Sequence, residues 1–63
     1  MMIISFFRSA LNSKDELYKM SLMSVNFTYD IDEKEALSIA ITDFQNKMQI
    51  EHWQEIAEFY EIN

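Results

Sequence analysis

The chain has 63 residues, a net charge of −6, and no cysteine, glycine or proline. Disulfides are therefore excluded, and without glycine the chain cannot contain a phosphate-binding P-loop, a dinucleotide-binding fingerprint or the nucleophile elbow of hydrolases. Residues 1–63 should form one small domain, whose core supplies only about 3–5 kcal/mol unless self-association adds to it. Because 49% of the residues are hydrophobic, a homodimer is expected. With glycine absent, left-handed turn positions are expected at Asn12, Asn26 and Asn46.

Charge is unevenly distributed along the sequence. Residues 1–29 hold three basic residues against two carboxylates, a net charge of +1, whereas residues 30–63 hold nine carboxylates against two lysines, a net charge of −7. Nucleic-acid phosphates and anionic lipids repel such a chain, so we expect neither direct nucleic-acid binding nor membrane association. A basic protein is the natural partner. The apolar start of the chain lacks the basic region of an export signal, which predicts a cytoplasmic location.

The N-terminal part predicts a hairpin or strand pair. In residues 1–11 apolar side chains fall on both alternating faces, as in a strand covered on both sides, and residues 12–16 are polar and turn-like. Residues 23–29 alternate strictly between apolar and polar, which is typical of a strand with one buried face. The competing interpretation makes residues 1–11 and 13–23 helical, and the protein an all-α helical dimer.

Residues 30–48 have the spacing of an amphipathic helix, expected from about residue 32 to residue 47. Its N-terminal cap is predicted at Asp30, because Glu33 follows three residues later in the manner of a capping box. Apolar residues recur at intervals of one, three and four, which places them on one face; they are Ala36, Leu37, Ala40, Ile41, Phe44 and Met48. We expect this stripe to cover the strand formed by residues 23–29.

The C-terminal tail, EHWQEIAEFYEIN, allows two interpretations. Ala57 and the four glutamates favour a helix over about residues 51–61. Read as a strand instead, the tail would complete a ββαβ unit. We predict an α+β domain in which an N-terminal hairpin packs on the central helix and a second helix follows at the C-terminus.

Residues with catalytic or metal-binding chemistry are sparse. His52 and Glu55 are three residues apart and could share a helical face, but a single histidine without a second ligand cluster does not define a metal site. The serines and tyrosines have no activating base other than this histidine. We therefore expect no catalytic, cofactor-binding or metal residues and no enzymatic activity.

The glutamates of the tail are the candidate interaction surface. Read as a helix, the tail places Glu51, Glu55, Glu58 and Glu61 on its solvent side, without lysines four residues away to pair with them. Phe59 falls outside the apolar stripe, which predicts an interface anchor. These features favour a non-enzymatic module that binds or inhibits a basic protein. The alternative is a structural or assembly subunit whose acidic face only confers solubility.

In general character the chain resembles the small accessory proteins that bacteriophages make early in infection. The resemblance rests on the acidic helix start DIDEKEAL and the acidic aromatic tail EHWQEIAEFYEIN, and it includes no diagnostic motif. Members of that loose group often bind and redirect host proteins. The resemblance thus implies host modulation through a basic host protein and transfers no site residue.

Overall fold

The two N-terminal strands form a long antiparallel hairpin, as predicted, but the second strand runs from Leu17 to Phe27 and not over residues 23–29. In the computed structural model, which describes all 63 residues, β1 (Met2–Leu11) pairs with β2 (Leu17–Phe27). The turn between them is built around Asn12, whose Oδ1 accepts hydrogen bonds from the backbone N–H groups of Lys14 at 2.8 Å and Glu16 at 3.0 Å. This bonding pattern fixes the turn by a side chain where glycine is absent.

One β-bulge interrupts the hairpin. Phe6 is paired with Met23 but Phe7 with Ser21, so Leu22 has no partner in β1. The extra residue shifts the alternation of β2 by one position. Residues of the same parity therefore lie on opposite faces of β2 before and after the bulge.

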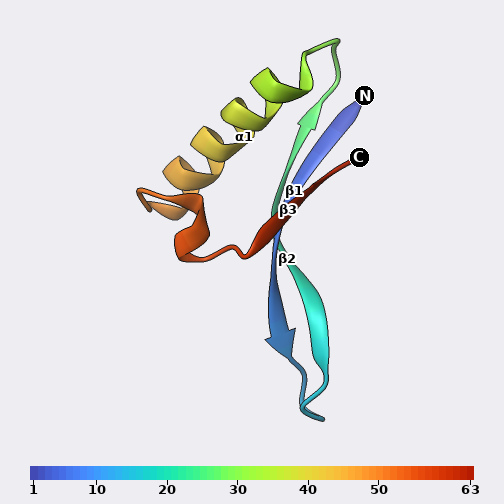
Figure 1. Cartoon of the computed structure of the whole chain (residues 1–63), viewed down its shortest axis with the longest axis vertical. Coiled ribbons are helices and arrows are strands. Elements are labelled where there is room, and N and C mark those ends of the chain that lie inside the picture. The colour runs from blue at the N-terminus through green and yellow to red at the C-terminus, as the bar shows by residue number, and fades with distance from the viewer.

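The central helix α1 (Glu33–Met48) packs on one face of the sheet (Figure 1). The predicted helix and its apolar stripe are confirmed, but the predicted cap at Asp30 is wrong. Asp32 caps the helix: its carboxylate accepts from the N–H groups of Lys34 and Glu35, and its own backbone is extended. Asp30 lies in the segment that leads from β2 to the helix and is exposed.

The core lies between α1 and the sheet. Phe44 of the helix and Phe6 of β1 are both fully buried, and their rings stack with centroids 4.4 Å apart. Two alanines on the same helix face are also fully buried and bring the helix backbone close to the strands. The complete set of buried apolar residues is Ile4, Phe6, Phe27, Ala36, Ala40, Phe44 and Ala57.

The second helix predicted for residues 51–61 is wrong. The tail forms a 3₁₀ turn, η1 (Trp53–Glu55), and then a strand, β3 (Phe59–Ile62). β3 pairs antiparallel with β1, giving the sheet order β2-β1-β3 and a ββαβ order of elements. The free edge of β1 needs hydrogen-bond partners, and supplying them outweighs the weak helix propensity of the tail. The α+β class is confirmed.

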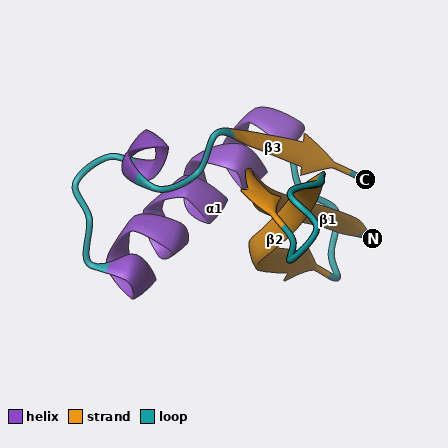
Figure 2. Cartoon of the chain, turned by 90° about the horizontal axis from the view of Figure 1, so that it is seen from below, coloured by secondary structure: helices purple, strands orange, loops and turns teal.

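Helix and sheet form two layers, and the hairpin extends beyond the helix. The molecule measures 42 × 25 × 15 Å along its principal axes. Figure 2 shows α1 on one side of the strands, with no helix on the other side. The far end of the hairpin, residues 8–20, projects past the end of the helical layer (Figure 1). We call residues 8–20 the hairpin arm.

Two residues have the positive φ angles that glycine usually takes. They are Asp15 in the hairpin turn, with φ 60°, and Gln49 at the end of α1, with φ 56°, so the expectation that asparagines hold these positions is wrong. Gln49 donates to the carbonyl of Asn46 at 3.3 Å, and Ile50 donates to that of Gln45 at 3.0 Å. This is the Schellman pattern that commonly ends a helix at glycine.

Replacing Gln49 with glycine is therefore expected to stabilise the protein. A residue with a side chain costs about 1–2 kcal/mol in the left-handed region, and glycine removes this cost. Glycine also loses more conformational entropy on folding, which offsets part of the gain, so we expect a net stabilisation of about 0.5–1 kcal/mol. Urea denaturation followed by circular dichroism measures the change. Asn46→Gly, inside α1, is the matched control and should destabilise by about the same amount. Equal effects at the two positions would contradict the left-handed conformation of Gln49.

Candidate interaction surfaces

The structure separates the residues that the helical interpretation of the tail had gathered on one face. Glu51 and Glu55 lie at η1, beside the end of α1. Glu58 immediately precedes β3. Phe59 and Glu61 belong to β3 and lie on the sheet face opposite α1, because their partners in β1 are Phe7 and Ser5. The predicted surface is therefore not one continuous helix face.

Glu55 and His52 serve the local backbone. The Glu55 carboxylate accepts from the N–H groups of Glu51 and His52, both at 2.9 Å, and Nδ1 of His52 accepts from the N–H of Gln54 at 3.4 Å. This reciprocal arrangement is a capping box, which satisfies donors that a helical turn leaves free. The spacing of His52 and Glu55, considered above as a metal motif, is thus used for capping.

The other tail residues have partners far away in the sequence. The Glu58 carboxylate accepts a hydrogen bond from the backbone N–H of Ser9, and Glu61 forms an ion pair with Lys19 at 2.9 Å. Phe59 is half-buried and stacks on Phe7, with ring centroids 5.5 Å apart. The inference that these glutamates lack partners and that Phe59 stands free is therefore wrong. Of the five predicted residues, Glu51 alone has a side chain without a hydrogen bond or stacking partner.

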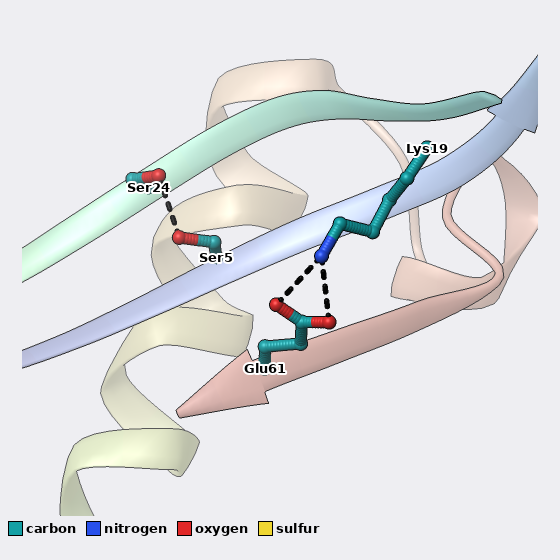
Figure 3. A network of polar contacts seen from close by, with 4 residues as sticks. All are labelled: Ser5, Lys19, Ser24 and Glu61. Carbon is teal, nitrogen blue, oxygen red and sulfur yellow. Dashed lines mark hydrogen bonds and ion pairs between the residues drawn. The ribbon is translucent and has the colours of Figure 1, made fainter. Parts of the chain in front are cut away.

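The uncovered face of the sheet has its own network of contacts (Figure 3). Lys19 reaches from β2 across β1 to Glu61 on β3, with its ammonium group 4.6 Å from the centroid of the Phe7 ring. Ser5, which is buried, shares a 2.7 Å hydrogen bond with Ser24. Cation–π and ion-pair contacts thus tie the three strands together on the side without a helix. Sequence reasoning missed this network; its only signal was the mixed character of both faces of β1.

The net charge of the protein resides in one layer. We define the helical layer as residues 30–58, which include α1 and η1, and the sheet layer as the remaining residues. The helical layer holds eight carboxylates against two lysines, a net charge of −6, whereas the sheet layer holds three carboxylates against three basic residues and is neutral. One ion pair exists in the whole chain, and it lies in the sheet layer. The helical layer is therefore the strongly negative side of the molecule.

Apolar side chains are exposed on the hairpin arm. Leu17 is 75% exposed, Leu11 60% and Tyr18 46%. Leu11 and Leu17 are cross-strand partners, and Tyr18 is paired with Ala10. Leu11 has the parity of Phe7 in β1, so the leucine pair lies on the face opposite α1, whereas Tyr18 lies on the other face beyond the end of the helical layer. None of the three side chains is covered within the chain.

The surface has no pocket, and no three potential metal-ligating side chains are grouped together. No helix in the structure has the length and apolar character needed to span a membrane. Compared with known protein families, curated proteins and solved structures, the chain matches none of them. The surfaces themselves are thus the basis for inferring function.

Proposed function

We propose that this protein is a small, non-enzymatic interaction module that binds a basic protein through the carboxylates of its helical layer. The observation that carries the proposal is the separation of charge, with −6 on the helical layer and zero on the sheet layer. Such a one-sided field attracts and orients a positively charged partner and raises its rate of association. The resemblance to phage accessory proteins makes a basic host protein in the cytoplasm the partner to test.

The carboxylates suited to this role are those that the fold does not use. Five carboxylates of the helical layer are exposed and accept no hydrogen bond within the chain, and they are Asp30, Glu33, Glu35, Asp43 and Glu51. Glu35, Asp43 and Glu51 are spread along α1 and η1 and are the three chosen for substitution. Glu55 and Glu58 also belong to the helical layer, but both hold backbone N–H groups. Substitutions at these two would disturb folding and binding together, so they are poor probes of binding.

The test compares two triple variants of equal net charge. Glu35→Gln, Asp43→Asn and Glu51→Gln together remove three charges from the helical layer and bring the net charge to −3. The control adds three lysines to the sheet layer, at Ser13, Thr28 and Asn63, and also reaches −3. Proteins captured from host lysate by each variant are quantified by mass spectrometry at low and high salt.

The helical-layer variant should capture the basic partner about tenfold less than the natural protein, because exposed charge pairs are worth about 0.2–1 kcal/mol each. The control variant should retain capture, and salt should weaken capture by the natural protein. If both variants lose capture equally, net charge rather than this surface governs binding. If neither does, the charged surface is not the binding site.

The second candidate function is an assembly subunit whose acidic layer provides solubility alone. The exposed leucines of the hairpin arm favour it, because side chains such as Leu17 would be covered in a larger assembly. Capture that is insensitive to salt and to the helical-layer variant, but is lost in Leu17→Ser, would support this function instead.

A further inference from the structure

The outer edge of β2 is an unprotected strand edge. β2 is eleven residues long and pairs only with β1, whereas the other edge strand, β3, has four residues. Natural proteins protect such edges with proline, charged side chains or bulges. β2 has no proline, and its one charged residue, Lys19, is directed across the sheet to Glu61. The bulge at Leu22 is the single protective feature.

The backbone groups that face outward from β2 follow from the ladder. Ile3 exchanges both of its backbone hydrogen bonds with Asn63, at 2.9 Å each, so it bonds towards β3. Because successive residues of a central strand bond alternately to its two neighbours, Ile4 bonds towards β2 and its partner Val25 bonds inward. Alternation then leaves two residues beyond the bulge with outward backbone groups, Ser24 and Asn26.

The ladder also fixes which backbone groups face outward in the other half of the strand. The N–H of Asn12 donates to the carbonyl of Glu16 at 3.0 Å, which makes this a hydrogen-bonded pair. Alternation places Tyr18 and Met20 in the bonded pairs that follow. The residues with outward backbone groups in this half are Leu17, at the start of the strand, and then Lys19 and Ser21.

We propose that β2 pairs antiparallel with β2 of a second copy of this chain, joining the two sheets into one of six strands. One symmetric register matches the outward groups with each other: Ser21 faces Ser24 of the second copy, and Lys19 faces its Asn26. The two bulges then meet at the centre, where neither interrupts the pairing on either side of it.

The side chains agree with this register on both faces. On the face that bears α1, Tyr18 lies opposite Phe27 of the second copy, and Met20 lies opposite its Val25. Apolar residues thus meet apolar residues there, and Tyr18, which is 46% exposed in the single chain, gains a cross-strand neighbour. On the other face serine meets serine and the lysine meets an asparagine, so like charges are not opposed.

Charge favours a second copy as the occupant of this edge. A basic partner is drawn to the helical layer, which carries −6, and the neutral sheet layer offers it no such attraction. Two copies repel each other through their helical layers and can approach closely through their sheet layers.

The accessible surface of the single chain is 4637 Å², above the roughly 4,300 Å² typical of a monomer of this mass. Pairing at β2 covers part of that surface.

Sedimentation velocity and amide hydrogen exchange on the full chain test the proposal. The natural protein should sediment as a dimer that dissociates on dilution. The outward amides of β2, at Lys19, Ser21, Ser24 and Asn26, should be protected from exchange in the dimer and lose protection as it dissociates. A monomer at every concentration, or a dimer whose outward amides exchange as fast as those of the hairpin turn, would overturn the proposal.

Variants locate the interface. Asn26→Pro removes an outward N–H without breaking the internal ladder and should weaken dimerisation at least about tenfold, whereas Asn26→Thr keeps the N–H and should dimerise normally.

If the proline variant does not fold, Tyr18→Glu provides the test, because it places a charge against Phe27 of the second copy. Its control is Ile39→Glu on α1, away from the edge. Dimerisation that survives Tyr18→Glu but not Ile39→Glu would place the interface on the helix instead. All of these variants leave the carboxylates of the helical layer in place. A negative result for dimerisation therefore does not count against the proposed function.

Discussion

Replacing Phe44 with alanine is expected to leave much of the protein unfolded at room temperature. The Phe44 side chain is fully buried, and its ring stacks nearly parallel on Phe6, with an interplanar angle of 9°. Truncating a buried phenylalanine to alanine costs about 3–5 kcal/mol. The core of a domain of this length supplies only about 3–5 kcal/mol, so the cost of this one substitution is comparable with the whole stability.

Urea denaturation monitored by far-UV circular dichroism measures this loss. Phe59→Ala is the matched control, since it removes the same side chain from the sheet face opposite α1, where the ring is only half-buried against Phe7. We expect a cost of about 1 kcal/mol there, from partial burial and one aromatic pair. Comparable losses at the two positions would mean that the core does not lie between α1 and the sheet.

Two elements could be predicted because their signals are local. The stripe from Ala36 to Met48 repeats with the helix period, and residues 23–27 alternate with the strand period, so each element shows its buried face in its own sequence. The helix cap was misplaced by two residues, because Asp30 and Asp32 both precede the apolar stripe and both can cap. Asp30 lies outside the helix, in the segment that connects β2 to α1, and only the structure shows which of the two aspartates accepts from the first free N–H groups.

The sequence favours the wrong one of the two interpretations of the tail, because the reason for its strand lies at the other end of the chain. β3 forms by pairing with residues 4–7 of β1, and nothing between Glu51 and Asn63 signals the free strand edge. The partners of Glu58 and Glu61 could not be predicted for the same reason. Glu61 and Lys19 are 42 positions apart, and Glu58 and Ser9 are 49 apart. A test for partners at neighbouring helical positions cannot find such contacts.

The two proposed surfaces can operate together because they belong to different layers. A dimer formed at the β2 edge keeps both helical layers free, since neither α1 nor η1 takes part in the pairing. It would also present two acidic surfaces to a partner. Two linked sites raise apparent affinity by increasing the effective concentration at the second site. A variant that cannot dimerise should therefore bind a basic partner more weakly wherever both sites can be engaged.

The second large effect is expected from enlarging Ala40. This alanine is fully buried where α1 meets the sheet, and with Ala36 it allows the helix to approach the strands closely. A leucine at position 40 has no space unless the helix moves away, and such overpacking costs about 1–3 kcal/mol. Ser38→Leu is the control on the exposed side of the same helix, where we expect a change of at most about 0.5 kcal/mol.

Thermal unfolding followed by circular dichroism distinguishes the two leucine variants. In a domain of this size each kcal/mol shifts Tm by about 4–8 °C, so Ala40→Leu should lower Tm by about 4–24 °C, while Ser38→Leu should change it by at most about 4 °C. α1 belongs to the helical layer, which carries all of the net charge. The position of this charge relative to the sheet therefore depends on how Ala40 packs. Equal Tm values for the two variants would show that α1 does not pack on the sheet through its alanine face.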